Sequence, residues 1–415
     1  MVGIGGIGMS ALAQLLKHQG KKVSGSDREE SPTTALLHEK GIEVQIGHRA
    51  ENIPEETELI VYSDAVPADS AERIGARERG IRQVSYFELL GTVSKESRDI
   101  AVAGTHGKTT TTGMIAKILS DAGEKPTAII GSIVRDFSSN FLAGNNELFV
   151  IEACEYRDHL LELSPEILVI TNIELDHTDF FPSLSALQST FRAAVEKVPE
   201  HGAIIANPND PNVAAVLKGA KARVIDYTQK AVGSLQLVGE FNRDNARAAL
   251  AAALAAVPKL SPEAAVHSLS EFKGSWRRFE FKGETPQGAL VYDDYAHHPT
   301  AVAKTIAAAR EKFPDKKIVV AFHPHLFSRT KSFLKEFSDA LATADKAIVA
   351  PIYAAREKDD GSISHHSLAA SKKNVAALDS FDEIRDALLE EKEGALIITM
   401  GAGDIYKVAE QITEQ

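Results

Sequence analysis

The strongest chemical signal in this sequence is a glycine loop at residues 101–113 (AVAGTHGKTTTTG), between an apolar run and a helical pattern. Glycines let backbone N–H groups turn onto phosphate oxygens, and a helix N-terminus favours an anion. Lys108 would neutralise the β- and γ-phosphates of a nucleotide, and the Thr109 hydroxyl would bind Mg²⁺. Val102 stands where the full pattern has its first glycine, so the loop is a shortened variant. The residues predicted to contact ATP here are Gly104, Thr105, His106, Gly107, Lys108, Thr109 and Thr110.

Carboxylates should lie near this loop, because Mg²⁺ takes oxygen ligands. Glu152 and Glu155 follow the apolar run FVI, and Asp176, His177 and Asp179 follow the run VITNI. In a parallel sheet the ends of these strands meet at one edge, so we expect Thr109 and Glu152 to share a metal ion. A ligand role for His177, on a second metal, competes with a simple hydrogen-bonding role.

Two stretches near the C-terminus gather titratable side chains at strand ends, where open α/β sheets bind ligands. VYDDYAHHPTA contains Asp293, Asp294, Tyr295, His297 and His298, and FHPHLFSRT contains His325 and Arg329. An arginine there suits a carboxylate or a phosphate, which its planar guanidinium binds through two hydrogen bonds. The adjacent Arg277 and Arg278 in WRRFEFKG could bind a phosphate or remain solvated, and the alternative of surface charge with structural histidines stays open.

The chain opens with MVGIGGIGMS, in which Gly3, Gly5 and Gly8 match the G-x-G-x-x-G turn of dinucleotide-binding folds. That turn normally follows a strand, but only two residues precede Gly3 here. We therefore expect either a very short first strand, with a weakened centre of the first sheet, or a misplaced start codon. Asp27 follows at about the ~20-residue distance at which such folds place a ribose-binding acid.

Strand-length apolar runs alternate with helical patterns along nearly the whole chain, which predicts parallel α/β sheets. Three such cycles indicate three consecutive domains: an N-terminal Rossmann-like domain, a central P-loop domain with a mostly parallel sheet, and a C-terminal Rossmann-like domain. The boundaries that we expect are 1–96, 97–276 and 277–415.

The composition sets outer limits on function. The 415 residues are 44% hydrophobic and 25% charged, with a formal net charge of −12. An acidic chain is a poor general binder of nucleic acid, because phosphate backbones need a basic face. The single cysteine, Cys154, fits a reducing compartment. No apolar run reaches the roughly 20 residues of a membrane span, so we expect a cytoplasmic protein without membrane insertion. A monomer or weak homodimer is a separate expectation.

Taken in order, six motifs resemble those of the Mur ligases, the ATP-dependent amide-forming enzymes of peptidoglycan precursor synthesis. They are GIGGIGMS, AGTHGKTTTT, TNIELDH, RRFE, DDYAHHPT and PHLFSRT. The resemblance runs essentially from end to end. It implies that the three domains bind a UDP-sugar, ATP and an amino acid, and it favours the family branch that joins L-alanine to UDP-N-acetylmuramate.

The resemblance also implies roles for individual residues. Lys108 and Thr109 fall on the ATP phosphates and Mg²⁺, Glu152 on the same metal, and His177 near a second metal. Asn242, Asn245 and Tyr295 match positions near the adenine. His297 and Arg329 match positions around the muramate and amino-acid ends of the site. The UDP-sugar would be bound by Gly3, Gly5, Gly6, Gly8, Asp27, Ser63, Arg277 and Arg278.

Three positions depart from the pattern of the family. Phe241 stands where a histidine is usual, Leu326 where many members carry a second arginine, and Arg356 where glycine is common. The change at Leu326 implies that recognition of the amino acid depends more on Arg329.

The implied reaction converts a carboxylate into an acyl phosphate, which an amine then attacks. Lys108 and Mg²⁺ would stabilise the charge that moves during phosphoryl transfer. A general base must take a proton from the amine, and the sequence leaves His177 and His297 as alternatives.

Three rival functions explain less of the sequence. A nicotinamide-dependent oxidoreductase would use the opening glycines and Asp27 but leaves the lysine loop unexplained. A P-loop ATPase or kinase accounts for the central domain only. A murein-peptide recycling ligase, which joins a whole peptide to UDP-N-acetylmuramate, is the nearest alternative because it shares the phosphate loop and the HHPT motif.

Overall fold

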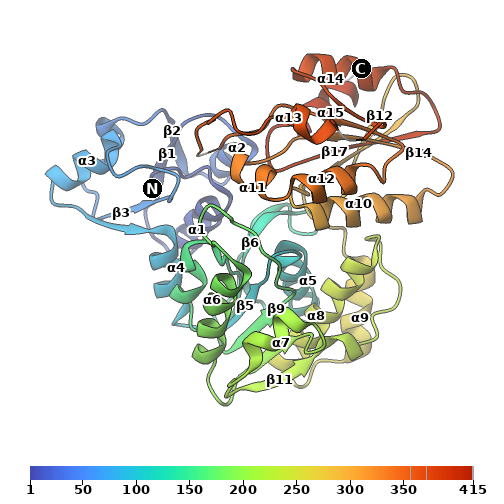
Figure 1. Cartoon of the computed structure of the whole chain (residues 1–415). Coiled ribbons are helices and arrows are strands. Elements are labelled where there is room, and N and C mark those ends of the chain that lie inside the picture. The colour runs from blue at the N-terminus through green and yellow to red at the C-terminus, as the bar shows by residue number, and fades with distance from the viewer. Residues whose placement is uncertain (356, 371, 414–415) are drawn as a thin grey trace. The chain divides into compact units, whose positions relative to one another are not determined.

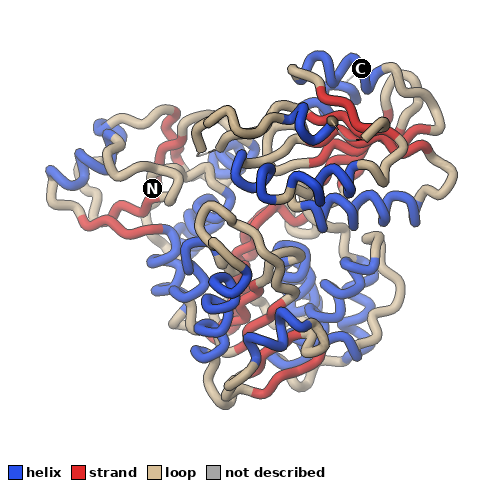
Figure 2. Tube along the Cα trace, viewed as in Figure 1, coloured by secondary structure: helices blue, strands red, loops and turns tan. Residues whose placement is uncertain are grey.

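The computed structural model describes residues 1–355, 357–370 and 372–413. Helices and strands alternate along the chain, as Figures 1 and 2 show. The chain forms two compact units. The first comprises Met1–Glu174, Ser185–Gln236 and Asp244–Lys273, and the second comprises Leu175–Leu184, Leu237–Arg243 and Gly274–Gln415. No described helix combines the length and the apolar character that crossing a bilayer requires.

The N-terminal part of the first unit contains two small parallel sheets in place of one continuous sheet. The first pairs β1 (Ser24–Asp27) with β2 (Glu43–Ile46), and the second pairs β3 (Leu59–Tyr62) with β4 (Arg82–Ser85). Val2 lies between them and forms single parallel bridges to Ser26 and to Tyr62. One buried residue thus lies between the two sheets, in agreement with the very short first strand that the sequence predicts. The helices of this part are α1 (Ile7–His18), α2 (Pro32–Glu39), η1 (Ala50–Asn52), α3 (Ala71–Glu78) and α4 (Tyr86–Ser94).

The rest of the first unit is built on a seven-stranded sheet of order β11-β10-β9-β5-β8-β6-β7, in which only the β6–β7 pair is antiparallel. Its strands are β5 (Arg98–Ala103), β6 (Thr127–Val134), β7 (Ser139–Leu142), β8 (Leu148–Glu152), β9 (Ile167–Ile170), β10 (Ala203–Ala206) and β11 (Arg223–Asp226). Its helices are α5 (Lys108–Asp121), η2 (Tyr156–Glu162), α6 (Leu184–Lys197), α7 (Pro211–Leu217), η3 (Tyr227–Gln229), α8 (Glu240–Ala256) and α9 (Pro262–Glu271). The first residue of α6 and residues 240–243 of α8 belong to the second unit. Because β5 lies between β8 and β9, the carboxyl ends of these three strands are adjacent.

The second unit contains a six-stranded sheet of order β12-β13-β17-β14-β15-β16, parallel except for β12. Its strands are β12 (Glu280–Glu284), β13 (Leu290–Asp294), β14 (Lys317–Phe322), β15 (Lys346–Val349), β16 (Val375–Ala377) and β17 (Ala395–Met400). Its helices are α10 (Pro299–Lys312), α11 (Phe327–Ser332), α12 (Leu334–Leu341), α13 (His365–Ala369), α14 (Phe381–Leu389) and α15 (Tyr406–Thr413).

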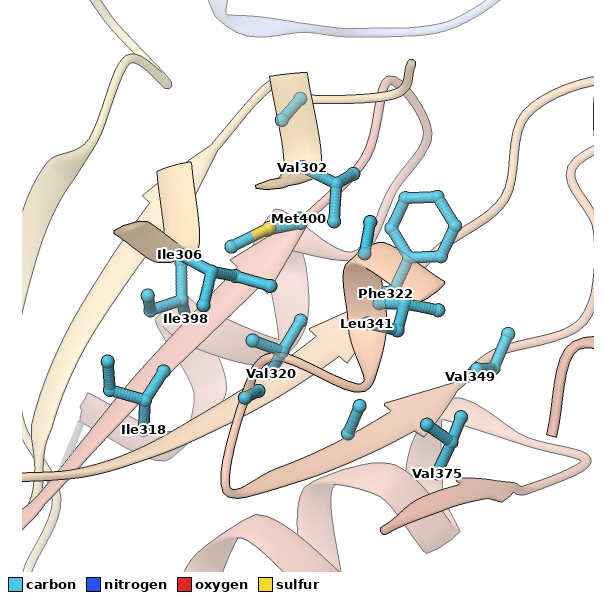
Figure 3. Packing of buried hydrophobic residues seen from close by; sticks show 14 of the residues in the cluster. Val302, Ile306, Ile318, Val320, Phe322, Leu341, Val349, Val375, Ile398 and Met400 are labelled. Carbon is cyan, nitrogen blue, oxygen red and sulfur yellow. The ribbon is translucent and has the colours of Figure 1, made fainter. Parts of the chain in front are cut away.

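The β14 strand shows how this sheet is buried on both faces. Ile318, Val320 and Phe322 belong to one apolar cluster, together with side chains of α10 and α12 (Figure 3). The alternate residues Val319 and Ala321 belong to a second cluster with side chains of α14 and α15. This period of two is the expected consequence of strand geometry. The helices therefore cover both faces, as in a doubly wound α/β fold, and the predicted fold class is confirmed.

Candidate active site

The loop between β5 and α5 has the backbone geometry of a phosphate-binding turn. Gly104 and Gly107 adopt left-handed φ angles of 135° and 83°. A Cβ atom at Gly104 would lie 2.1 Å from Thr171 Oγ1, and one at Gly107 would lie 2.2 Å from Asn245 Oδ1. Both the φ angles and the lack of space therefore require glycine. Gly107 is also the N-cap of α5, so the first amides of that helix follow directly after the loop.

The residues that follow β9 hold this loop from the neighbouring strand. Asn172 Oδ1 accepts a hydrogen bond from the His106 backbone N–H at 3.0 Å, and Asn172 Nδ2 donates to the His106 carbonyl at 3.0 Å. Thr171 Oγ1 donates to the same carbonyl at 2.6 Å. Thr105 Oγ1 donates to the Glu174 carbonyl and accepts from the Glu174 N–H. Sequence reasoning missed this support, and its only signal was the polar pair Thr171-Asn172 at the end of an apolar run.

Lys108 is the first residue of α5, and its ammonium is held by protein acceptors. Nζ lies 3.0 Å from both carboxylate oxygens of Glu155 and 2.5 Å from the Gly104 carbonyl. Burial by itself would lower the pKa of Lys108, but the Glu155, Cys154 and Glu152 groups raise it above its ordinary value. Lys108 is therefore a fixed positive charge beside the phosphate loop.

Thr109 and Glu152 meet as the sequence predicted. Thr109 Oγ1 donates to Glu152 Oε1 at 2.9 Å, and the Gly131 N–H donates to Glu152 Oε2 at 2.6 Å, which fixes the carboxylate. Two adjacent ligands of an octahedral Mg²⁺, each at about 2.1 Å, lie roughly 3 Å apart. The oxygen donors and their separation therefore fit Mg²⁺. His177 belongs to the other unit, so its share in this metal site stays a prediction.

The opening glycine turn is tied to Asp27 at the end of β1. The Gly5 N–H donates to Asp27 Oδ2 at 2.7 Å, and the Gly3 N–H donates to the Ser26 carbonyl at 2.9 Å. Ser63, which follows β3, is held next to the same turn because its N–H donates to the Val2 carbonyl at 3.0 Å. Gly3, Gly5, Asp27 and Ser63 are thus brought together just before α1, and Gly6 is the N-cap of that helix. Contact of this turn with a UDP-sugar stays a prediction.

Gly8 lies inside α1, after the glycine turn, and packs against an aromatic ring. A Cβ atom there would lie 2.7 Å from the ring of Tyr86. Close packing of α1 against the start of α4 therefore explains this glycine without any ligand.

In the second unit, Arg329 forms a buried ion pair with Asp176. Arg329 Nε donates to Asp176 Oδ1 at 2.8 Å, and the two side chains are only 2% and 6% exposed. Arg329 Nη1 also donates to His325 Nδ1 at 3.1 Å. Burial opposes ionisation of Asp176, but Arg329 and the histidines around it hold its pKa well below the ordinary value. Arg329 therefore has a fixed position, and Asp176 is the partner that fixes it.

His297 and His298 are adjacent but differ in chemistry. His298 is the N-cap of α10: its Nδ1 accepts from the Thr300 N–H, and its Nε2 donates to the Leu175 carbonyl. His297 donates from Nδ1 to the Tyr295 carbonyl at 2.9 Å. Burial, reinforced by Arg329, lowers the pKa of His297 well below 6.5. His297 is therefore a neutral imidazole whose Nε2 carries a lone pair, whereas His298 has a structural role.

Arg277 holds the glycine turn that follows β17. Its guanidinium donates to Asp293 at 2.7 Å, to the Gly401 carbonyl at 2.6 Å and to the Gly403 carbonyl at 2.9 Å. The side chain is 4% exposed. These contacts give Arg277 a structural role that the sequence did not suggest, and its predicted contact with a UDP-sugar remains a prediction.

Arg278 and Tyr295 lie together. The Arg278 guanidinium is 5.0 Å from the centre of the Tyr295 ring. The Tyr295 N–H donates to the Arg277 carbonyl at 2.7 Å, which anchors the ring near both arginines. The predicted binding of a UDP-sugar by Arg278 and of adenine by Tyr295 stays a prediction.

Helix α8 carries the two predicted adenine residues one turn apart, and residues at that spacing share a helix face. Asn242 Nδ2 donates to the Val238 carbonyl at 2.7 Å, so this side chain caps the preceding turn. Asn245, in contrast, lies against Gly107 of the phosphate loop. Phe241, at the first departure from the family pattern, lies close to Gly239 in the same turn.

Glu357 is a positioning residue that sequence reasoning missed. Its carboxylate accepts from the Ser328 N–H at 3.0 Å and from the Ser328 hydroxyl at 2.5 Å. Ser328 lies in the first turn of α11, whose N-cap residue Leu326 offers no side-chain hydrogen bond. Glu357 therefore supplies the cap of the short helix that carries Arg329. Leu326 itself is 1% exposed, and Arg356 lies outside the described residues.

Comparisons with known proteins agree along the whole chain. Three family models match: "Mur ligase family, catalytic domain" over residues 1–98, "Mur ligase middle domain" over 102–233, and "Mur ligase, glutamate ligase domain" over 277–403. The UDP-N-acetylmuramate–L-alanine ligase of Clostridium acetobutylicum is 38% identical over 443 aligned residues, which cover 99% of this chain and 96% of that protein.

Two solved structures extend the similarity to the fold. The UDP-N-acetylmuramate–alanine ligase of Thermotoga maritima has a TM-score of 0.82 at 29% identity, covering 100% of this chain and 97% of that one. A murein peptide ligase of Psychrobacter arcticus has a TM-score of 0.76 at 26% identity, covering 99% and 97%.

The support of the phosphate loop by Asn172 gives the first prediction. Asn172→Ala removes two hydrogen bonds to the His106 backbone, at about 1 kcal/mol each. We expect Mg²⁺–ATP to bind roughly tenfold to thirtyfold more weakly, because the loop loses its preformed shape. Isothermal titration measures this change, with the exposed Asn209→Ala as the matched control. Unchanged affinity in a folded Asn172→Ala protein would contradict the assigned role.

Proposed function

The chain belongs to the Mur ligase family, and we propose that it uses ATP to join L-alanine to the carboxylate of UDP-N-acetylmuramate. The observation that carries this proposal is the phosphate loop itself, with Lys108 fixed beside it and the Thr109–Glu152 pair at its end. The 38% identity over 99% of the chain to a ligase named for these substrates supports the choice within the family.

The chemistry follows from the poor reactivity of a carboxylate toward amines. Attack of the muramate carboxylate on the γ-phosphoryl group forms an acyl phosphate and releases ADP. The amine then attacks the carbonyl carbon, and the tetrahedral intermediate expels phosphate and leaves the amide. Lys108 stabilises the charge on the transferring phosphoryl oxygens, a role for which its raised pKa keeps it protonated. The γ-phosphate competes with Glu155 for this ammonium.

Thr109 and Glu152 hold Mg²⁺ in this proposal. When bound, the ion neutralises part of the negative charge on the β- and γ-phosphates, which otherwise repels the attacking carboxylate. Glu152 keeps its position because the Gly131 N–H holds its second oxygen.

His297 is one candidate for the general base, and His177 remains the alternative. A base must be unprotonated, and the Nδ1–H of His297 is engaged with the Tyr295 carbonyl, which leaves Nε2 as the acceptor. The lowered pKa of His297 keeps it neutral at physiological pH. As the amine attacks, Nε2 can take the proton that the nitrogen must lose. The buried Arg329–Asp176 pair lies in direct electrostatic contact with this imidazole and supports a positioning role for Arg329.

A murein peptide ligase activity is the second candidate, because such an enzyme of Psychrobacter arcticus shares the fold over 99% of this chain. The higher TM-score of the alanine ligase from Thermotoga maritima, 0.82 against 0.76, favours alanine.

Neither a nicotinamide-dependent reaction nor a switch ATPase draws support from the comparisons. A cytoplasmic location and a monomer or weak homodimer complete the proposal.

A phosphate-release assay tests the function directly. The assay contains UDP-N-acetylmuramate, ATP and Mg²⁺, with L-Ala, L-Ser, Gly or a tripeptide offered in parallel. We expect L-Ala to give the highest kcat/KM, and Lys108→Ala to lower turnover by at least roughly 10²–10³-fold, because it removes a charge from the transferring group. The exposed Lys259→Ala serves as the control.

Two results would overturn the assignment. A preference for tripeptide over L-Ala would favour the recycling reaction. Near-normal turnover by Lys108→Ala would remove the phosphate loop from the mechanism.

The assignment of His297 gives a prediction about pH. Because the folded protein lowers the pKa of this imidazole below 6.5, its unprotonated form persists as the pH falls through 6.5. We therefore expect kcat to keep its neutral-pH value through that range. His297→Gln should lower kcat roughly 10²-fold or more without lowering the melting temperature. The exposed His201→Gln is the control. A kcat that halves near pH 6.5 in the wild type, or a fully active His297→Gln, would refute this role.

A further inference from the structure

A cluster of two histidines and one aspartate lies outside every residue used above. His365 and His366 are the first two residues of α13, and Asp379 lies in the turn between β16 and α14. Figure 1 labels α13 and α14. The Nε2 atoms of both histidines are 2.9 Å from the same oxygen of Asp379. One donor atom from each residue lies within 4.8 Å of the other two.

The convergence of the two imidazoles is not a general property of helices. Neighbouring residues of an α-helix point about 100° apart, so adjacent histidines ordinarily face different directions. Here the two ring centres are 4.2 Å apart, and both rings direct Nε2 toward one carboxylate. The cluster thus presents two nitrogens and one oxygen to a single point.

We propose that His365, His366 and Asp379 form a binding site for a divalent transition metal of the Zn²⁺, Co²⁺ or Ni²⁺ class. Imidazole nitrogen suits these ions, whereas Mg²⁺ prefers oxygen. Ligand atoms of a tetrahedral ion with bonds of about 2.1 Å lie roughly 3.4 Å apart. The 2.9 Å separations therefore need to open by about 0.5 Å. Each imidazole would carry its proton on Nδ1, exchanged through solvent, and would bind the ion through the lone pair of Nε2.

The backbone around the cluster is anchored, which lowers the cost of assembling the site. The Ser338 hydroxyl donates to the Leu368 carbonyl at 2.9 Å and ties α13 to α12. On the other side, the Asp379 N–H donates to Glu383 Oε2 at 3.0 Å. His365 is buried, with an 11% exposed side chain, whereas the side chains of His366 and Asp379 are 58% and 70% exposed. A metal thus has access from solvent, and water can complete its coordination.

A bound ion would link α13 to the turn before α14. The segment 357–364, which begins with the capping residue Glu357, ends where α13 begins. Binding to the folded state alone raises stability by mass action. The site therefore predicts a metal-dependent increase in the stability of the second unit, separate from the Mg²⁺ that the ligase reaction uses.

The test uses the full chain, freed of metal by a chelator that is then removed. Zn²⁺ is titrated by calorimetry and its effect on the melting temperature is recorded, for the wild type and for His366→Ala and Asp379→Asn. We expect one Zn²⁺ per chain whose affinity falls at least tenfold in each variant, because each lacks one of three ligands. Zn²⁺ should raise the melting temperature of the wild type more than that of the variants.

The control is His267→Ala, which removes an exposed histidine that has one carboxylate neighbour, Glu271 at 3.6 Å. This variant should bind Zn²⁺ like the wild type. If the wild type and both site variants bind Zn²⁺ equally, or if the wild type binds none below 100-fold molar excess, the proposal is wrong. Co²⁺ supplies a second readout should one variant fold poorly: its visible absorption band should be present in the wild type and weaker in whichever site variant folds.

Discussion

The hydrogen bonds between the residues after β9 and the loop after β5 are the constraint on which the proposed nucleotide site depends. A phosphate loop binds only if its amides already point inward, and a loop of this length has many other conformations. Asn172 forms hydrogen bonds with the N–H and the carbonyl of His106, and Thr171 donates to the same carbonyl. The Glu174 N–H donates to the Thr105 hydroxyl. The loop therefore has its shape before a nucleotide binds. Lys108 and Thr109 follow directly after the loop, so their positions are fixed as well.

In the second unit, buried ion pairs fix the positions of candidate site residues. The Arg277 guanidinium donates hydrogen bonds to Asp293 and to two carbonyls of the turn after β17. Arg329 forms an ion pair with Asp176. Removing such groups from water is costly, so a buried pair is weak evidence for stability. Its better-supported consequence here is position: hydrogen bonds direct each guanidinium, and the charges of Arg329 and Asp176 act on the pKa of His297.

The sequence predicted the strand, the glycine loop and the helix that follows it because these elements are local. A strand, a glycine loop, a lysine and a helix are contiguous, and the match of Thr109 with Glu152 follows from adjacent strand ends. The single bridges of Val2 to the two small sheets agree with the very short first strand that was expected. The support from Asn172, the pairing of Lys108 with Glu155 and the cap supplied by Glu357 were missed. They depend on which strands become neighbours and on side-chain direction, and neither is encoded in local spacing. The different chemistry of His297 and His298 likewise follows from their partners, since the two residues are identical in sequence.

Oxygen transfer from the sugar acid to phosphate tests the central claim most directly. UDP-N-acetylmuramate labelled with oxygen-18 in its carboxylate is incubated with enzyme, Mg²⁺, ATP and L-alanine, and the released phosphate is analysed by mass spectrometry. An acyl phosphate breaks at the carbonyl carbon, so its bridging oxygen leaves with the phosphate. The account predicts one oxygen-18 atom in each phosphate formed. Unlabelled phosphate, released together with the amide product, would show that ATP does not activate this carboxylate and would contradict the account.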